Sequence, residues 1–214
     1  MKNITRATIA FAPLCIALVF MASHHSAQAE STHSPQELEQ FRQLRNGLLD
    51  RIAAGNSAAI ETSIKNFNAF MNDYPNSIQR RMAQLSLLEA HIHTKGDCVR
   101  INALTDSALA DYSAHSELHL AAQALNANAC DPQRGVHFSR RAITELADTT
   151  SPHMPRYLLT LGQALLQQEK KAEATATLHR ALTLQSRLTE ESRNGHGALK
   201  SLLEDLLSSI QRGK

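Results

Sequence analysis

The sequence predicts an all-α protein, and three observations carry this prediction. The chain of 214 residues has only 8 Gly, 6 Pro and no Trp, and its aromatic content is 4%, which is poor for β-sandwiches, barrels or glycine-rich phosphate loops. It is rich in Ala, Leu, Gln and Arg, which are good helix formers. Apolar residues recur at helical spacing, and no segment shows the two-residue alternation of strands. We expect antiparallel helix hairpins followed by a terminal helix.

The N-terminal segment 1–29 has the order of a secretory signal peptide. Lys2 and Arg6 supply positive charge, residues 7–22 form an uncharged and mostly apolar run, and Ala27-Gln28-Ala29 is a small-x-small cleavage site. The apolar run is shorter than the ~20 residues that cross a bilayer as a helix. We therefore expect cleavage after Ala29 and export of a soluble chain, with the periplasm as its compartment. The alternative is that the segment stays attached as an N-terminal anchor.

The charge balance gives no argument for binding to nucleic acid or to an anionic membrane. The chain has 22 basic and 20 acidic residues. Two of the basic residues and none of the acidic ones precede Glu30, so the mature chain carries equal numbers of both. A neutral chain lacks the basic surface that phosphate-rich partners require.

The first two helices are delimited by their end signals. Ser34-Pro35-Gln36-Glu37 has the pattern of a capping box with proline at the first helical position, and Gly55 ends the apolar periodicity that follows. A second helix begins after Asn56 and breaks at Tyr74-Pro75.

Two further helices are expected before Tyr112. The third covers about 77–93 and ends at Lys95-Gly96. Asp97 is a capping residue for a fourth helix, which extends to about Tyr112. The residues of the third helix expected to face the core are Met82, Leu85, Leu88 and Ile92.

Five helices are expected in the rest of the chain. Asp131 as N-cap and Pro132 as first helical residue start one that extends to about Leu146. Apolar periodicity gives the others, at about 116–129, 154–168, 170–187 and 198–211.

The segment Pro155–Leu188 resembles a tetratricopeptide repeat, a helix–turn–helix unit of 34 residues. Counted from Pro155, Leu161-Gly162 stands at positions 7 and 8, Ala174 at position 20 and Ala181 at position 27. Small residues at positions 8, 20 and 27 let the two helix backbones approach closely. Leu158 replaces the usual Trp of the pattern, and Ser186 replaces its terminal Pro.

Weaker copies precede this unit. Gly135, Ser139 and Ala142 fit positions 20, 24 and 27 of one copy, and Ala108 fits position 27 of the copy before it. The resemblance covers about 34–188 and implies a right-handed α-solenoid. After a short linker at 30–33, a helical domain over 34–214 would contain hairpins at about 35–74, 77–112, 116–147 and 154–187 and a capping helix at about 198–211. A plain helical bundle is the alternative.

The resemblance also implies a binding function. In this family the first helices of successive repeats line a concave groove, chiefly at positions 2, 5, 9, 12 and 13. In this sequence the residues at these positions are mostly polar and include several amides, which suits an extended peptide or a partner helix. We therefore expect an exported adaptor that binds protein or peptide, with envelope assembly and secretion among the roles that the resemblance allows. The residues at the groove positions are Ser86, His93, Glu117, Asn128, Arg156, Leu159, Gln163 and Gln167.

Histidines offer the main alternative chemistry. His115 and His119 have the i, i+4 spacing that places two imidazoles on one helix face for a metal. Glu117 does not follow His115 directly, so the H-E-x-x-H pattern is absent, as are nucleophile-elbow, P-loop and C-x-x-C motifs. We expect surface histidines, no metal, no cofactor and no catalytic residues. The alternatives are a metal-binding or enzymatic protein that uses its histidines, and a self-associating structural component of the envelope.

Two cysteines remain after Cys15 leaves with the signal segment, and an even number pairs without remainder in an oxidising compartment. In the repeat numbering, Cys98 falls at position 17 and Cys130 at position 15 of the next copy. Both positions belong to turns of neighbouring hairpins, which stack with helix axes ~8–10 Å apart. The repeat phase therefore predicts a Cys98–Cys130 disulfide, and two free thiols are the alternative.

The signal prediction is tested by the mass of the exported protein. We expect its N-terminus at Glu30, because the small side chains of Ala27 and Ala29 fit the cleavage-site pattern. Intact-mass measurement checks this, with Ala29→Arg as the control that should block cleavage. An exported chain that keeps residues 1–29 would show that the cleavage prediction is wrong.

Overall fold

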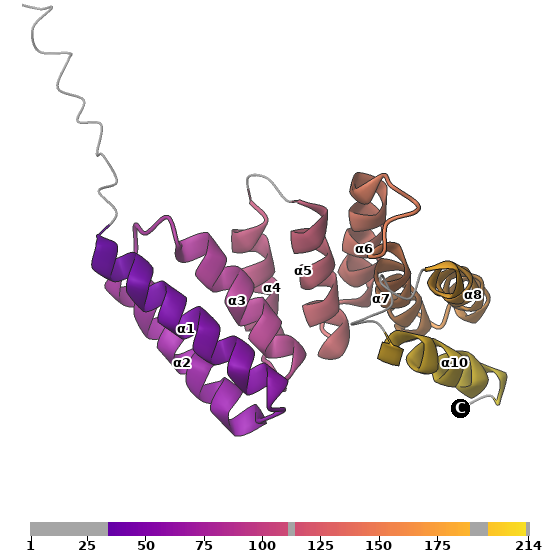
Figure 1. Ribbon diagram of the computed structural model, residues 1–214, viewed down its shortest axis with the longest axis horizontal. Coiled ribbons are helices and arrows are strands. Elements are labelled where there is room, and N and C mark those ends of the chain that lie inside the picture. The colour runs from indigo at the N-terminus through magenta and orange to yellow at the C-terminus, as the bar shows by residue number, and fades with distance from the viewer. Residues whose placement is uncertain (1–33, 111–113, 189–196, 213–214) are drawn as a thin grey trace, which may run out of the picture. The chain divides into compact units, whose positions relative to one another are not determined.

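The computed structural model describes residues 34–110, 114–188 and 197–212. The predicted signal peptide and linker lie outside these ranges. Every regular element within them is an α-helix, which confirms the predicted all-α class (Figure 1). The helices are α1 (Pro35–Ala53), α2 (Ser57–Asp73), α3 (Arg80–Ile92), α4 (Cys98–Ala108), α5 (His115–Ala127), α6 (Pro132–Leu146), α7 (Met154–Gln167), α8 (Lys171–Arg187) and α10 (Gly197–Gln211).

The predicted caps hold at two helices and fail at one. The carboxylates of Asp97 and Asp131 accept the backbone N–H groups of Val99 (3.1 Å) and Arg134 (3.0 Å), at the starts of α4 and α6. The expected capping box at α1 is wrong, because the side chain of Ser34 makes no capping bond. Its intended partner, Glu37, accepts a hydrogen bond from Ser77 instead.

α3 and α4 are shorter than expected. A local side-chain hydrogen bond accounts for the later start of α3, and a long-range one accounts for the earlier end of α4. α3 begins at Arg80 rather than at 77, because the hydroxyl of Ser77 accepts the N–H of Gln79 (2.9 Å) and holds a turn there. α4 ends at Ala108 rather than near Tyr112, where Arg81 of α3 donates to the carbonyl of Ala108 (2.9 Å). A terminal helix carbonyl that finds such a partner needs no further helical turn.

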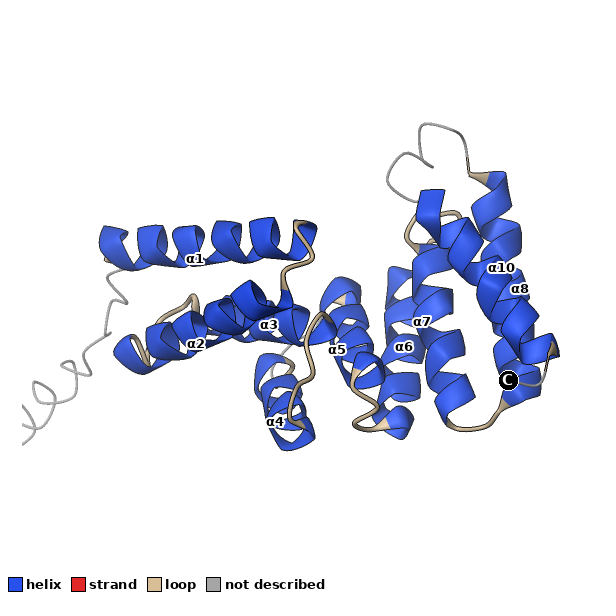
Figure 2. Ribbon diagram, turned by 90° about the horizontal axis from the view of Figure 1, so that it is seen from below, coloured by secondary structure: helices blue, strands red, loops and turns tan. Residues whose placement is uncertain are grey.

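The helices pack in a regular order. Each of α1, α3, α5 and α7 contacts the helix that follows it, and α1, α3 and α5 each also contact the next member of this same set. Each of α2, α4 and α6 also contacts the helix after it, so a chain of neighbours runs from α1 to α8 (Figure 1). α10 lies along α8, as both views show (Figure 2). We call α1, α3, α5 and α7 the first helices, and α2, α4, α6 and α8 the second helices.

The core consists of several clusters of buried apolar side chains. The largest joins α1 to α5, with Phe67 and Phe70 fully buried at its centre. A second joins α7, α8 and α10 through Leu158, Leu178 and Leu203. Met82 was expected in the core, but its side chain is 45% exposed. The buried face of α3 is already occupied by small and leucine side chains, and Met82 lies on the face that lines a cleft.

Small residues bring α7 and α8 together, as the repeat pattern predicts. A Cβ atom on Gly162 would lie 2.6 Å from a methyl carbon of Leu178, which is far inside van der Waals contact. Ala174 and Ala181 on α8 are completely buried. The same device recurs at Gly135 of α6, where a Cβ atom would lie 2.2 Å from Oδ1 of Asn126.

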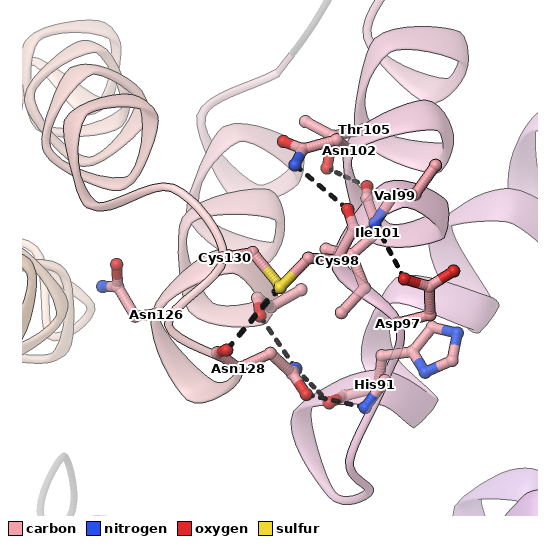
Figure 3. Close-up of a disulfide and its surroundings, with 12 residues drawn as sticks. His91, Asp97, Cys98, Val99, Ile101, Asn102, Thr105, Asn126, Asn128 and Cys130 are labelled. Atoms are coloured by element: carbon pink, nitrogen blue, oxygen red, sulfur yellow. Dashed lines mark hydrogen bonds between the residues drawn. A yellow bond between two sulfur atoms is a disulfide. The ribbon is translucent and has the colours of Figure 1, made fainter.

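The predicted disulfide joins Cys98 at the start of α4 to Cys130 in the turn between α5 and α6 (Figure 3). Their Cα atoms are 5.0 Å apart, within the range that a disulfide requires. The disulfide therefore holds the start of α4 beside the turn that follows α5.

Asn128 reinforces the same junction. Its Nδ2 donates to the carbonyl of His91 (2.7 Å) and its Oδ1 accepts the N–H of Gly96 (2.8 Å), so one side chain ties the end of α5 to the turn between α3 and α4 (Figure 3). The disulfide and this amide together fix α5 against α3 and α4.

Substitution of a buried small residue tests the helix packing. We expect Ala181→Leu to lower the free energy of unfolding by about 1–3 kcal/mol, because the added atoms overpack the α7–α8 crossing. Chemical denaturation measures this change, and Ala176→Leu, at an exposed position of the same helix, is the control. Equal stability of the two variants would mean that α7 and α8 do not approach as closely as described.

Removal of the disulfide tests the second junction. The bond closes a loop between residues separated by 32 positions, and the chain-entropy estimate for such a loop is about 3.7 kcal/mol. We expect the Cys98→Ser/Cys130→Ser variant to lose stability of this order and to match the chemically reduced parent. Two titratable thiols in the unreduced, denatured mature chain would refute the pairing.

Candidate functional site

Two adjoining clefts open on the side of the first helices. The α7 cleft, of about 610 Å³, is lined mainly by α5, α7 and α10. The α5 cleft, of about 480 Å³, is lined mainly by α3, α5 and the start of α7. Gln123 and Arg156 line both clefts, so the two form one continuous feature, which we call the groove.

The α7 cleft combines apolar side chains with amides. Leu159 and Leu199 are buried in its wall, whereas Leu202 of α10 is 46% exposed. The side-chain amides of Gln123 and Gln163 have no hydrogen-bond partner among the described residues and line the same cleft. Their donors and acceptors are therefore open to a bound molecule.

Hydrogen bonds to Asn126 connect α5 and α7 beneath this cleft. Its Nδ2 donates to the carbonyl of Thr160 (2.9 Å), and its own carbonyl accepts Nε2 of Gln167 (2.7 Å). Because Asn126 is buried, these bonds fix the spacing of the two helices rather than contribute to the open surface.

The α5 cleft contains a stacked pair of rings. The imidazole of His119 lies on the ring of Tyr157, with centroids 4.0 Å apart and planes inclined by 16°. The hydroxyl of Tyr157 shares a hydrogen bond of 2.9 Å with Nδ1 of His115. The i, i+4 histidines of α5 thus enclose a tyrosine of α7 from two sides.

His119 is held neutral by its surroundings. Its side chain is only 7% exposed, so the expectation of a surface histidine is wrong here. Burial is the main cause that lowers its pKa, to about 3. Smaller contributions in the same direction come from the charge of Arg156 and from the neighbouring His153 and His115. Burial also raises the pKa of the Tyr157 hydroxyl.

No cluster of three or more His, Cys, Asp or Glu side chains suitable for a metal occurs within the described ranges. His91, the other buried histidine of the described ranges, lies in the last turn of α3. Burial lowers its pKa, and a Cβ atom on Gly96 would lie 2.7 Å from its Nδ1. His91 is therefore tightly packed against the turn that contains Gly96.

Charged side chains in the groove are paired, with one exception. Arg45 forms an ion pair with Glu89, and Glu117 forms one with Arg81. Arg156, at the junction of the two clefts, is exposed, and its guanidinium group has no hydrogen-bond or carboxylate partner among the described residues. Within the part of the chain that the structure describes, the groove therefore presents one uncompensated positive charge, where its two clefts meet.

Six of the eight predicted groove residues line this groove. Arg156, Leu159, Gln163 and Gln167 meet in the α7 cleft, and Ser86 and Glu117 line the α5 cleft. Ser86 is nevertheless almost fully buried and donates to the carbonyl of Met82 (2.8 Å), so it contributes little surface.

The remaining two predicted groove residues lie elsewhere. His93 lines a separate shallow cleft with residues from the start of α2. Asn128 is engaged in the α3–α5 junction described above. The phase of the repeat places both near the ends of first helices, where turns rather than the groove surround them.

Sequence reasoning missed two contributors to the groove, Tyr157 and α10. Tyr157 has no distinguishing pattern in the sequence. The apolar stripe of α10 was assigned to capping alone. Leu203 is buried, but the adjacent Leu202 is exposed and lines the α7 cleft, so α10 has a second apolar face.

None of the helices in the described ranges combines the length and apolar character that a membrane-spanning helix needs. Comparison of the chain with models of known protein families, with curated proteins and with solved structures found no match.

The neutral state of His119 gives a pH dependence of stability. Below pH 6.5 the unfolded chain binds a proton at this residue, whereas the folded protein does not bind it until about pH 3. The contribution of His119 is therefore complete above pH 6.5 and is lost as the pH falls towards 3, by up to about 1.4 kcal/mol per pH unit.

We expect His119→Phe, which keeps a ring on Tyr157 and does not titrate, to lose less stability than the parent between pH 6.5 and pH 4. Denaturation curves across this range measure the difference, and His179→Phe at an exposed site is the control. Parallel pH profiles for the parent and His119→Phe would contradict the assignment.

Proposed function

We propose that this chain is an exported, tetratricopeptide-like adaptor that binds a protein or peptide partner in the groove and carries out no catalysis. The groove carries the proposal. It is continuous across three first helices and α10, and it offers apolar side chains, open amides and one open cation. This combination of apolar contacts and a few polar anchors is typical of protein-binding surfaces.

The order of helix contacts supports the repeat assignment. In a stack of helix hairpins, each first helix meets its own second helix and the next first helix, as α3 meets α4 and α5. Gly162, Ala174 and Ala181 occupy close helix crossings, as the repeat pattern requires. The second helices cover one side of the row of first helices. The groove lies on the other side of this row.

The disulfide supports the proposed export. Structural disulfides form and persist in oxidising compartments such as the bacterial periplasm. Both cysteines of the predicted mature chain are used in the Cys98–Cys130 bond. This agrees with the signal-like order of residues 1–29.

Site-specific photocrosslinking in the native cell tests the function. A photoreactive amino acid at Gln163 lies in the α7 cleft, and the same group at His179, exposed on α8, is the matched control. We expect the Gln163 position to give an adduct with another protein that the His179 position does not give.

Two results would contradict the proposal. Absence of adducts from Gln163, or the same adducts from both positions, would mean that the groove does not select a partner. Adducts that contain only a second copy of this chain would support a self-associating structural component instead.

A further inference from the structure

The groove contains enough chemistry to define its ligand more closely. Resting on the proposed function, we infer that the groove binds a peptide segment that presents an acidic side chain to Arg156 and a leucine-sized apolar side chain to the adjoining α7 cleft.

The first support is the unequal pairing of charges. Glu89 and Glu117, the two carboxylates that line the groove among the described residues, are held in ion pairs by Arg45 and Arg81. Arg156 has no such partner among the described residues, although it is exposed and lines both clefts. A guanidinium group presents a planar fork of donors that fits a carboxylate in a two-bond arrangement.

The second support is the charge of the side chains that surround Arg156. His115 and His153 line the α5 cleft together with Arg156, and an imidazole carries no negative charge in its neutral or protonated form. His119 also adds no negative charge, because its buried imidazole stays neutral. The centre of the groove is therefore complementary to an anion and would repel a basic side chain.

The third support is the apolar surface next to Arg156. Leu159 follows it by one turn of α7, and residues three apart on a helix are neighbours. Leu199 and the half-exposed Leu202 of α10 face the same cleft. A ligand that places a carboxylate at Arg156 therefore has an apolar site about one helical turn away, so we expect its acidic and apolar residues within four positions of each other.

A peptide fits these features better than a small acid does. The clefts of about 610 and 480 Å³ extend on both sides of Arg156. The open amides of Gln123 and Gln163 line the groove with it and match the N–H and C=O groups of a peptide backbone. A single carboxylic acid would leave both the amides and the apolar site without a partner.

Selection from a random dodecapeptide phage library tests this inference. The protein purified as its cell produces it is compared with Arg156→Glu and with Arg180→Glu, a charge reversal at an exposed position of α8. We expect the parent and Arg180→Glu to enrich peptides with Asp or Glu beside a leucine-type residue. Arg156→Glu should lose this preference and favour Lys or Arg. Thermal melting confirms that each variant is folded.

Affinity measurements on one selected peptide provide the second readout. We expect Arg156→Gln to weaken binding about tenfold at low salt, since one charge-assisted contact is lost. Replacing the acidic residue of the peptide by its amide should have a similar effect. The two changes together should cost little more than either alone, which is the signature of a direct pair.

The outcomes separate the inference from the proposed function. Enriched peptides without an acidic preference, or the same acidic motif on Arg156→Glu, would overturn the inference and leave peptide binding in place. Failure of the folded parent to enrich any peptide would overturn both.

Discussion

The close approach of paired helices is the constraint on which the rest of this structure depends. Gly162 packs directly on Leu178, and Ala174 and Ala181 are fully buried at the same pair of helices. Larger side chains at these places would force the helices apart, because protein interiors have no spare volume. With α8 drawn tightly onto α7, and α6 onto α5 at Gly135, these first helices lie beside one another. Their outer faces, unlike their inner ones, are then free to form the groove.

Hydrogen bonds and a disulfide near the ends of helices also fix the helices relative to one another. Asn126 joins α5 to α7, and Asn128 with the Cys98–Cys130 bond joins α5 to α3 and α4. α5, the central helix of the groove, is thus fixed to α7 by bonds in the wall of the α7 cleft and to α3 and α4 by bonds at its C-terminal end. A binding surface held in this way loses little conformational entropy when it takes up a ligand, which favours affinity for a given contact area.

Local signals in the sequence were sufficient for much of this fold and for part of the site. The caps Asp97 and Asp131 act within three residues, and the small residues of Pro155–Leu188 follow a fixed repeat, so both could be predicted. The end of α4 depends on Arg81, 27 positions away, and the burial of His119 depends on Tyr157 from another hairpin. No short-range pattern encodes such contacts. The part of α10 in the groove was missed for the same reason.

The central claim is that the face of the first helices, and not that of the second helices, binds the partner. Amide chemical shifts of the isotopically labelled protein, recorded during titration with a groove-selected peptide, test it most directly. The structure predicts that signals of Gln123, Gln163 and Leu202 move with a common dissociation constant, while those of His137 and His179 on α6 and α8 stay in place. Saturable shifts confined to α6 and α8 would contradict the claim.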